Sequence, residues 1–206
     1  MAPPISDAVV VDVLRRVDRL VTPLVNRLGR PGDLPRDQRD DWWAERASSV
    51  AAGVAAVPRL AGKLADLLPL QNTVGTAVQS VVVLGVAGEH DITDPAERVS
   101  LLARVLLGRE LSAQQVAPLL RRAKGTYLDD ALGRPGERSA ASTLWGVARL
   151  LGRIDDTLDS RPKGKLFARA VAYLPVVGVV GGYAAEREGL RRAADRTAAL
   201  LENPVS

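Results

Sequence analysis

The sharpest grouping of side chains that could do chemistry is an aspartate-rich motif, Asp155-Asp156-Thr-Leu-Asp159. Carboxylates four residues apart share one face of a helix and can hold a Mg²⁺ ion that binds a diphosphate. Basic side chains follow at Arg161 and Lys163, where they could assist with the negative charge. Mg²⁺-dependent diphosphate chemistry at Asp155, Asp156 and Asp159 is therefore one alternative function, and it would need further acids such as Asp129 and Asp130.

The same motif resembles the aspartate-rich motif of prenyl diphosphate synthases, which are also all-α, over about ten residues. A second aspartate-rich helix does not occur in this sequence. Three Trp, three Tyr and one Phe are too few to build an aromatic pocket around a carbocation. The motif is better interpreted as an acidic helix end that faces water, so we expect no metal and no cofactor.

Other catalytic patterns are missing from the sequence. His90 is the single histidine, and zinc or di-iron sites recruit several ligands from separate helices, so we expect a solvent-exposed loop histidine. There is no cysteine, no Gly-x-Ser-x-Gly elbow and no phosphate-binding glycine loop. The sequence favours a non-enzymatic protein with no catalytic residues.

Composition and charge narrow the class of protein further. The 206 residues are 47% hydrophobic, with few aromatic side chains, which favours closely packed helices built from Ala, Val and Leu. The net charge of +4 comes from the C-terminal half, because residues 1–103 are slightly acidic. With no run of five basic residues and few aromatics to stack bases, we expect no nucleic-acid partner.

Hydrophobic periodicity predicts helices throughout and a single all-α domain over residues 1–206. An N-terminal amphipathic helix should occupy most of residues 1–30, and residues 125–138 should form a loop. Further helices are expected at about 36–68, 72–87, 95–107, 139–159 and 182–202, with one that opens after Ser112 and runs through Leu120 and a short one ending at 173. Asp94 and Ser112 are predicted N-caps, each with Glu or Gln three residues later.

Two stretches carry no charge, residues 67–88 and 170–185. Each must be hidden from water, either in a helical core or against lipid. The first contains six polar residues and the second is short and broken by Pro175, so neither makes a comfortable membrane span. The N-terminus lacks the pattern of a secretion signal. We therefore expect a cytoplasmic location.

One larger arrangement joins these features. An apolar helix leads through a polar loop into Asp94-Pro-Ala-Glu97-Arg98, and Tyr173-Leu-Pro175-Val-Val-Gly178 leads through Gly181 and Gly182 into a charged last helix. This arrangement resembles the EcsC family of bacterial proteins over residues 36–107 and 165–202. Members typically have a P-x-E-R helix start and a glycine-rich apolar hairpin near the C-terminus. This chain lacks their aromatic or tyrosine-glycine ending of the apolar helix.

The resemblance implies a helical protein that touches a partner, and some members are associated with transport and secretion operons. We expect contact with an anionic membrane surface at the inner face of the membrane, or with a membrane-protein partner. The contact residues would be Tyr173, Pro175, Gly178, Gly181 and Gly182 of the hairpin, with Arg187, Arg191 and Arg192 beside them. The alternative is a soluble helical interaction module in which both uncharged stretches lie in the core.

Overall fold

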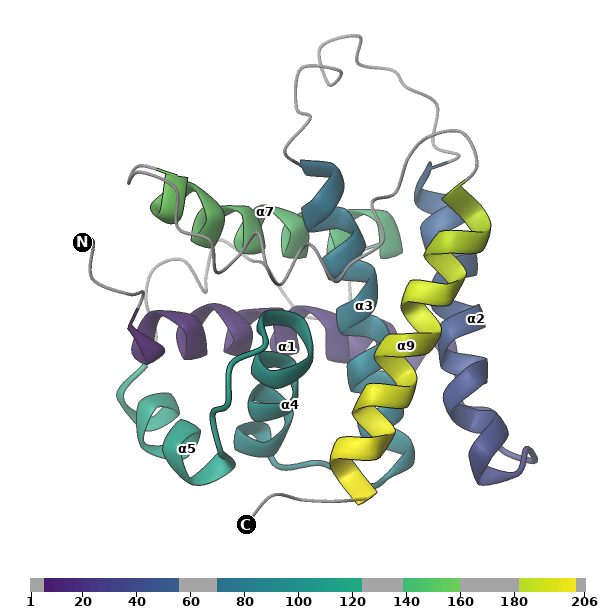
Figure 1. Ribbon diagram of the computed structural model, residues 1–206, viewed down its shortest axis with the longest axis horizontal. Coiled ribbons are helices and arrows are strands. Elements are labelled where there is room, and N and C mark those ends of the chain that lie inside the picture. Colours follow the sequence, from purple (N-terminus) through teal and green to yellow (C-terminus); the bar gives the residue numbers. More distant parts are fainter. Residues whose placement is uncertain (1–5, 56–69, 124–138, 160–181, 203–206) are drawn as a thin grey trace, which may run out of the picture.

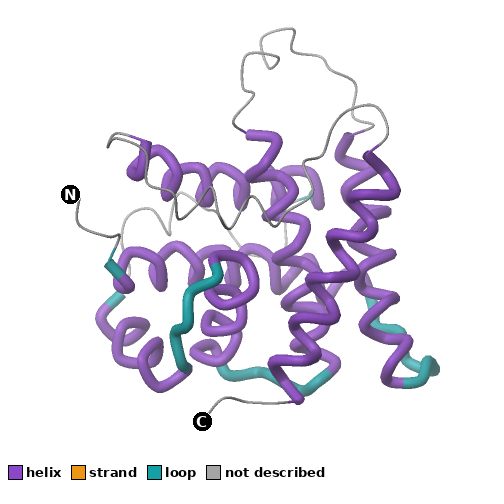
Figure 2. The backbone as a smooth tube through the Cα atoms, in the orientation of Figure 1, coloured by secondary structure: helices purple, strands orange, loops and turns teal. Residues whose placement is uncertain are grey.

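The computed structural model describes residues 6–55, 70–123, 139–159 and 182–202, and every regular element among them is an α-helix (Figures 1 and 2). The helices are α1 (Asp7–Leu28), α2 (Arg36–Ala55), α3 (Leu70–Glu89), α4 (Pro95–Leu107), α5 (Ala113–Arg122), α7 (Ala140–Asp159) and α9 (Gly182–Glu202). The prediction of an all-α fold is confirmed. The loop and short helix predicted for residues 125–138 and up to 173 lie outside the described residues.

The helix boundaries follow the capping residues of the sequence. The Asp94 side chain accepts a hydrogen bond from the Glu97 backbone N–H, with Pro95 opening α4. Gly108 ends that helix in the left-handed conformation, with φ 60°. At α5, Ser112 and Gln115 form a complete capping box, each side chain bonded to the other's backbone N–H. These local signals act over three or four residues, which is why they could be identified without tertiary information.

Helix α3 lies at the centre of the bundle. It contacts α1, α2, α4, α7 and α9, and Figure 1 shows α2 and α9 running alongside it. Every residue from Thr76 to Ala87 is buried. A helix that is apolar on all sides must be enclosed on all sides, and here other helices of the same chain do so.

The first uncharged stretch is therefore a core element over residues 76–87. Small side chains such as Ala77 and Ser80 let neighbouring helices approach it closely, and the Ser80 hydroxyl donates to the Ala77 carbonyl at 2.6 Å. Within the described part of the chain, no helix combines the length and the apolar character that crossing a membrane requires. The second uncharged stretch lies outside the described residues up to position 181.

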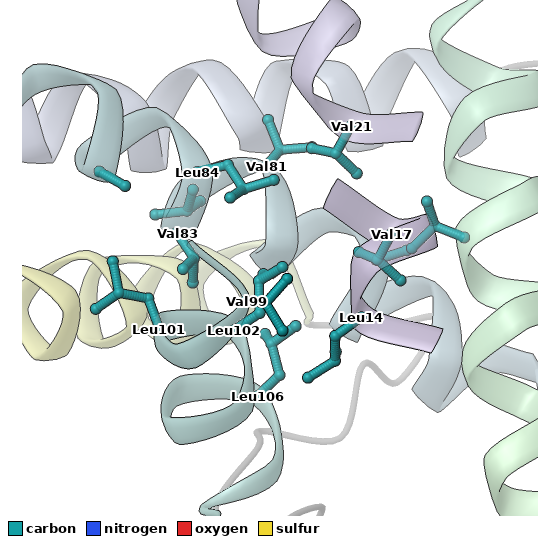
Figure 3. Packing of buried hydrophobic residues seen from close by; sticks show 14 of the residues in the cluster. Leu14, Val17, Val21, Val81, Val83, Leu84, Val99, Leu101, Leu102 and Leu106 are labelled. Carbon is teal, nitrogen blue, oxygen red and sulfur yellow. The ribbon is translucent and has the colours of Figure 1, made fainter. Parts of the chain in front are cut away.

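Helix α1 buries one long apolar face across α3, α4 and α7. Figure 3 shows Leu14 and Val17 of α1 meeting Leu102 and Leu106 of α4. One hydrophobic cluster joins buried residues from every described helix. Most of these residues are Val, Leu and Ala, as the scarcity of aromatic residues predicts.

One large aromatic side chain, Trp43, also lies in this core of Val, Leu and Ala, and its packing requires a glycine. Trp43 of α2 is almost completely buried, and its indole lies directly over Gly85 of α3. A Cβ atom at residue 85 would overlap the six-membered ring of that indole. The contact between α2 and α3 therefore requires that residue 85 has no side chain.

We expect Gly85→Ala to lower the free energy of unfolding by about 1–3 kcal/mol, because the indole must move within a filled core. Gly75→Ala on the same helix is the matched control, since a Cβ atom there meets nothing within 4 Å. That variant should be stabilised by about 0.5–1 kcal/mol through helix propensity. Urea unfolding followed by circular dichroism measures both changes, and equal effects of the two substitutions would contradict the proposed role of the Trp43 contact.

Candidate functional site

Most of the hairpin predicted to contact a partner lies outside the described residues, namely Tyr173, Pro175, Gly178 and Gly181. Gly182 is the first residue of α9. Their predicted contact with a membrane or partner stays a prediction based on the sequence.

The three arginines predicted beside the hairpin lie on α9, and each is near an acidic side chain. Arg187 forms an ion pair with Glu45 of α2, and Arg191 lies 3.8 Å from the carboxylates of both Asp41 and Glu45. Arg192 pairs with Glu188 of its own helix at 3.4 Å. The pairs that reach α2 help to hold α9 against it, so an anionic headgroup would have to compete with α2 for these two arginines.

The aspartate-rich motif lies within the last turns of α7, but the side chains of Asp155, Asp156 and Asp159 are outside the described part, as are Asp129 and Asp130. Among the side chains that the structure does describe, no three His, Cys, Asp or Glu residues come together as a metal site would need. The described residues therefore add no support for diphosphate chemistry, which stays a prediction from the sequence.

The expectation that His90 is a solvent-exposed loop histidine is wrong. Its side chain is only 9% exposed, and its Nε2 atom lies 3.8 Å from Asp40 Oδ2 of α2. His90 directly follows the last residue of α3, where its backbone N–H still bonds the Val86 carbonyl. The imidazole is covered because α2 packs along α3 up to this point, a tertiary contact that the local sequence does not encode.

The structure reveals a pocket that the sequence did not predict, at the C-terminal end of α3. It has a volume of about 230 Å³ and is enclosed by α1, α2, α3, the loop after α1, the α3–α4 loop and α4. Its lining combines apolar, hydroxyl, amide and charged side chains from these elements: Thr22, Val25, Asn26, Arg30, Trp43, Leu84, Gly85, Gly88, Glu89, Asp91, Ile92, Thr93 and Arg98.

One wall of the pocket holds a charged pair that bridges α1 and α4. The Arg98 guanidinium donates to Asp18 Oδ1 at 2.5 Å and to the Thr22 hydroxyl, and the two charged side chains are only 17% and 15% exposed. Burial raises the pKa of the Asp18 carboxyl above its ordinary value of 3.8, while Arg98 and then Thr22 act to lower it. Arg98 is the arginine of the P-x-E-R helix start, and this contact gives it a structural partner.

The pocket lining also includes a second buried charge, Glu89, whose side chain is 6% exposed. The Trp43 indole N–H donates to Glu89 Oε1 at 3.3 Å, and Arg39 lies 3.8 Å from Glu89 Oε2. Arg39 is itself held by the Leu34 carbonyl, to which its Nε–H donates at 2.7 Å. The carboxylate is thus fixed between α2 and the end of α3, with its charge compensated.

The floor of the pocket is the turn that ends α3, and it has the hydrogen bonds of a Schellman motif. The Ile92 N–H bonds the Ala87 carbonyl at 2.9 Å and the Asp91 N–H bonds the Gly88 carbonyl at 3.3 Å. Asp91 takes the left-handed position of the motif, with φ 57°, where glycine is the usual residue. It is the one non-glycine residue with positive φ in the described part of the chain.

Sequence analysis did not identify Asp18, Trp43 or Asp91 as site residues. A signal for Asp18 was present, because it lies four residues after Leu14 and three before Val21, on the apolar face of α1. A charged residue on a buried face needs a partner. No comparable local signal marks Asp91, since its importance depends on the pocket that other helices build around it.

Comparison with known proteins finds no matching family model, no matching curated protein and no matching solved structure. By its own fold and pocket, the protein is an all-α helical bundle with a polar pocket at the C-terminal end of α3. The similarity to the EcsC family stays a prediction.

The raised pKa of Asp18 predicts a pH dependence of stability. A group whose pKa is raised by folding contributes stability that is complete below its unfolded pKa and is lost as the pH rises through the folded pKa. Asp18→Asn keeps the shape of the protonated carboxyl and does not titrate. We expect the free energy of unfolding of the wild type, minus that of Asp18→Asn, to fall as the pH rises from below 3.8 towards neutrality.

Urea unfolding at a series of pH values measures this difference directly. A difference that stays constant or increases with pH would mean that attraction by Arg98 outweighs the cost of burying the carboxylate.

Proposed function

We propose that this chain is a non-enzymatic helical protein of the EcsC type that associates peripherally with an anionic membrane surface at the inner face of the membrane. The association would use residues 56–69, which connect α2 to α3, and residues 160–181, which lead into α9, whose first residue lies at the same end of the bundle as the start of α3. A membrane-protein partner at the same end, and a soluble module without membrane contact, are the competing outcomes of the test below.

The observation that carries this proposal is where these segments attach. Helix α2 ends at Ala55, α3 begins at Leu70 and α9 begins at Gly182, and all three helix ends lie toward the same end of the bundle, at the top of Figure 1. Residues 56–69 therefore join two helices at this end of the bundle, and residues 160–181, which follow α7, lead into α9 at the same end.

The composition of the two segments supports a lipid surface as the partner. Together they contain six basic residues and one acidic residue: Arg59, Lys63, Arg161, Lys163, Lys165 and Arg169, with Asp66. They also contain apolar runs such as Leu174 to Val177. Apolar side chains combined with Lys and Arg are what anionic bilayer surfaces bind, and each basic residue near the surface contributes about 1 kcal/mol.

The rest of the described surface supports placing the proposed lipid contact at this end of the bundle. Val9 is the one large hydrophobic side chain classed as exposed among the described residues, so an apolar docking face is not found on the helices themselves. Arg187 and Arg191 are engaged with α2. The contact with lipid would therefore depend on the segments more than on these arginines.

Flotation with vesicles tests the proposal. We expect the wild type to float with phosphatidylserine-containing vesicles at low salt, to stay behind with neutral phosphatidylcholine vesicles, and to be released at high salt because screening weakens the attraction. Removing two charges with Lys163→Gln and Lys165→Gln should weaken binding by about tenfold or more.

The matched control removes two exposed basic residues elsewhere, with Arg121→Gln and Arg122→Gln at the end of α5. This double variant should bind nearly as well as the wild type. Equal losses in both variants would indicate a diffuse effect of net charge, and wild type recovered only in the soluble fraction at low salt would favour the soluble module.

A further inference from the structure

The pocket at the end of α3 carries four charged side chains, and they fall into two groups. Arg98 and Glu89 are compensated within the protein, by Asp18 and by Arg39 with Trp43. Arg30 and Asp91 also line the pocket at its exposed rim, and neither makes an ion pair or a side-chain hydrogen bond within the described part of the chain. One cation and one anion thus remain for something that enters the pocket.

The Arg30 side chain lies beside a glycine of α3. Its Nη2 atom lies 4.0 Å from the place that a Cβ atom of Gly88 would occupy, so the guanidinium rests over the last turn of α3. Asp91 follows Gly88 by three residues, in the turn that ends the same helix. The two opposite charges therefore flank one helix end, at the surface of a pocket of about 230 Å³.

Asp91 is kept at a position where it is unfavourable for the backbone. A left-handed residue at the end of a helix is normally glycine, because a side chain there is strained. Glycine would fit this backbone position with less strain, and the Asp91 carboxylate makes no ion pair or side-chain hydrogen bond within the described residues. A left-handed non-glycine residue whose carboxylate lines a pocket is a candidate for a binding residue.

We propose that this pocket binds a small zwitterion the size of an amino acid, with its carboxylate on Arg30 and its ammonium group on Asp91. Such a ligand matches the two charges in number and sign. The volume is below the range of about 300–1,000 Å³ that drug-sized ligands occupy, which favours a compact molecule.

The remaining lining agrees with this class of ligand. Val25, Leu84 and Ile92 offer apolar surface for a carbon skeleton, while Asn26 and Thr93 offer hydrogen bonds beside the charged groups. The Trp43 indole N–H is already engaged by Glu89, so that ring serves as a wall and as a reporter of occupancy.

Protein-observed NMR with three matched probes tests the proposal. L-alanine carries both charges, L-alaninamide carries only the cation and N-acetyl-L-alanine only the anion. We expect saturable shifts of the Asp91–Thr93 amides and of the Trp43 indole with L-alanine up to about 20 mM, and at least tenfold weaker binding of the other two. L-leucine and L-serine are added as probes of other side chains.

Variants separate binding from folding. Asp91→Asn keeps the size of the side chain and removes its charge, so it should lose binding of L-alanine by about tenfold or more with little change in the melting temperature. Asp91→Gly should lose binding equally and raise the melting temperature by about 2–4 °C, because the backbone strain is relieved. Arg30→Gln should also lose binding.

The control is Asp33→Asn, which removes an exposed carboxylate of the loop after α1 that does not line the pocket, and it should bind like the wild type. The proposal is overturned if none of the three amino acids gives saturable shifts, if L-alaninamide or N-acetyl-L-alanine binds as tightly as L-alanine, or if Asp91→Asn binds normally. Vesicle flotation is independent of this outcome, so each proposal can fail without the other.

Discussion

The constraint on which the rest of the structure depends is the complete burial of α3. Its residues from Thr76 to Ala87 offer no charged side chain to water, so the surrounding helices must close around it on every side. Helices α1, α2, α4, α7 and α9 do so, and the small residues of α3 let them approach closely. The contact of Trp43 with Gly85 shows how tight this packing is, because one additional carbon atom would not fit.

An uncharged central helix also decides where the charges of the interior are placed. They gather where α3 ends, at Glu89 and His90, and the exposed Asp91 follows in the turn. Around this end, Arg39 and Asp40 come from α2, and Asp18 and Arg98 bridge α1 to α4. Buried charges require partners, and the pairs seen here tie α2 to the end of α3 and α1 to α4. The pocket is the space that remains between these pairs.

The two proposals concern opposite ends of α3. At its N-terminal end, the segments that join α2 to α3 and lead into α9 carry the basic and apolar residues proposed to meet a membrane surface. At its C-terminal end, Asp91 and Arg30 are proposed to bind a zwitterion. Both proposed sites are therefore attached to the same helix, which packs against five others.

The sequence by itself determined the helical class, the approximate extent of most described helices and the N-caps of α4 and α5, because periodicity and capping act within a few residues. It also showed that residues 67–88 had to be hidden from water, but it left core and lipid equally open. Tertiary structure decided that residues 76–87 of this stretch are core, that His90 is covered by α2, and that Asp18 meets Arg98 across 80 residues of chain. Each of these depends on which helices lie side by side, and such contacts join residues far apart in the sequence. The pocket has the same origin, since no segment of the chain contains more than a part of its wall.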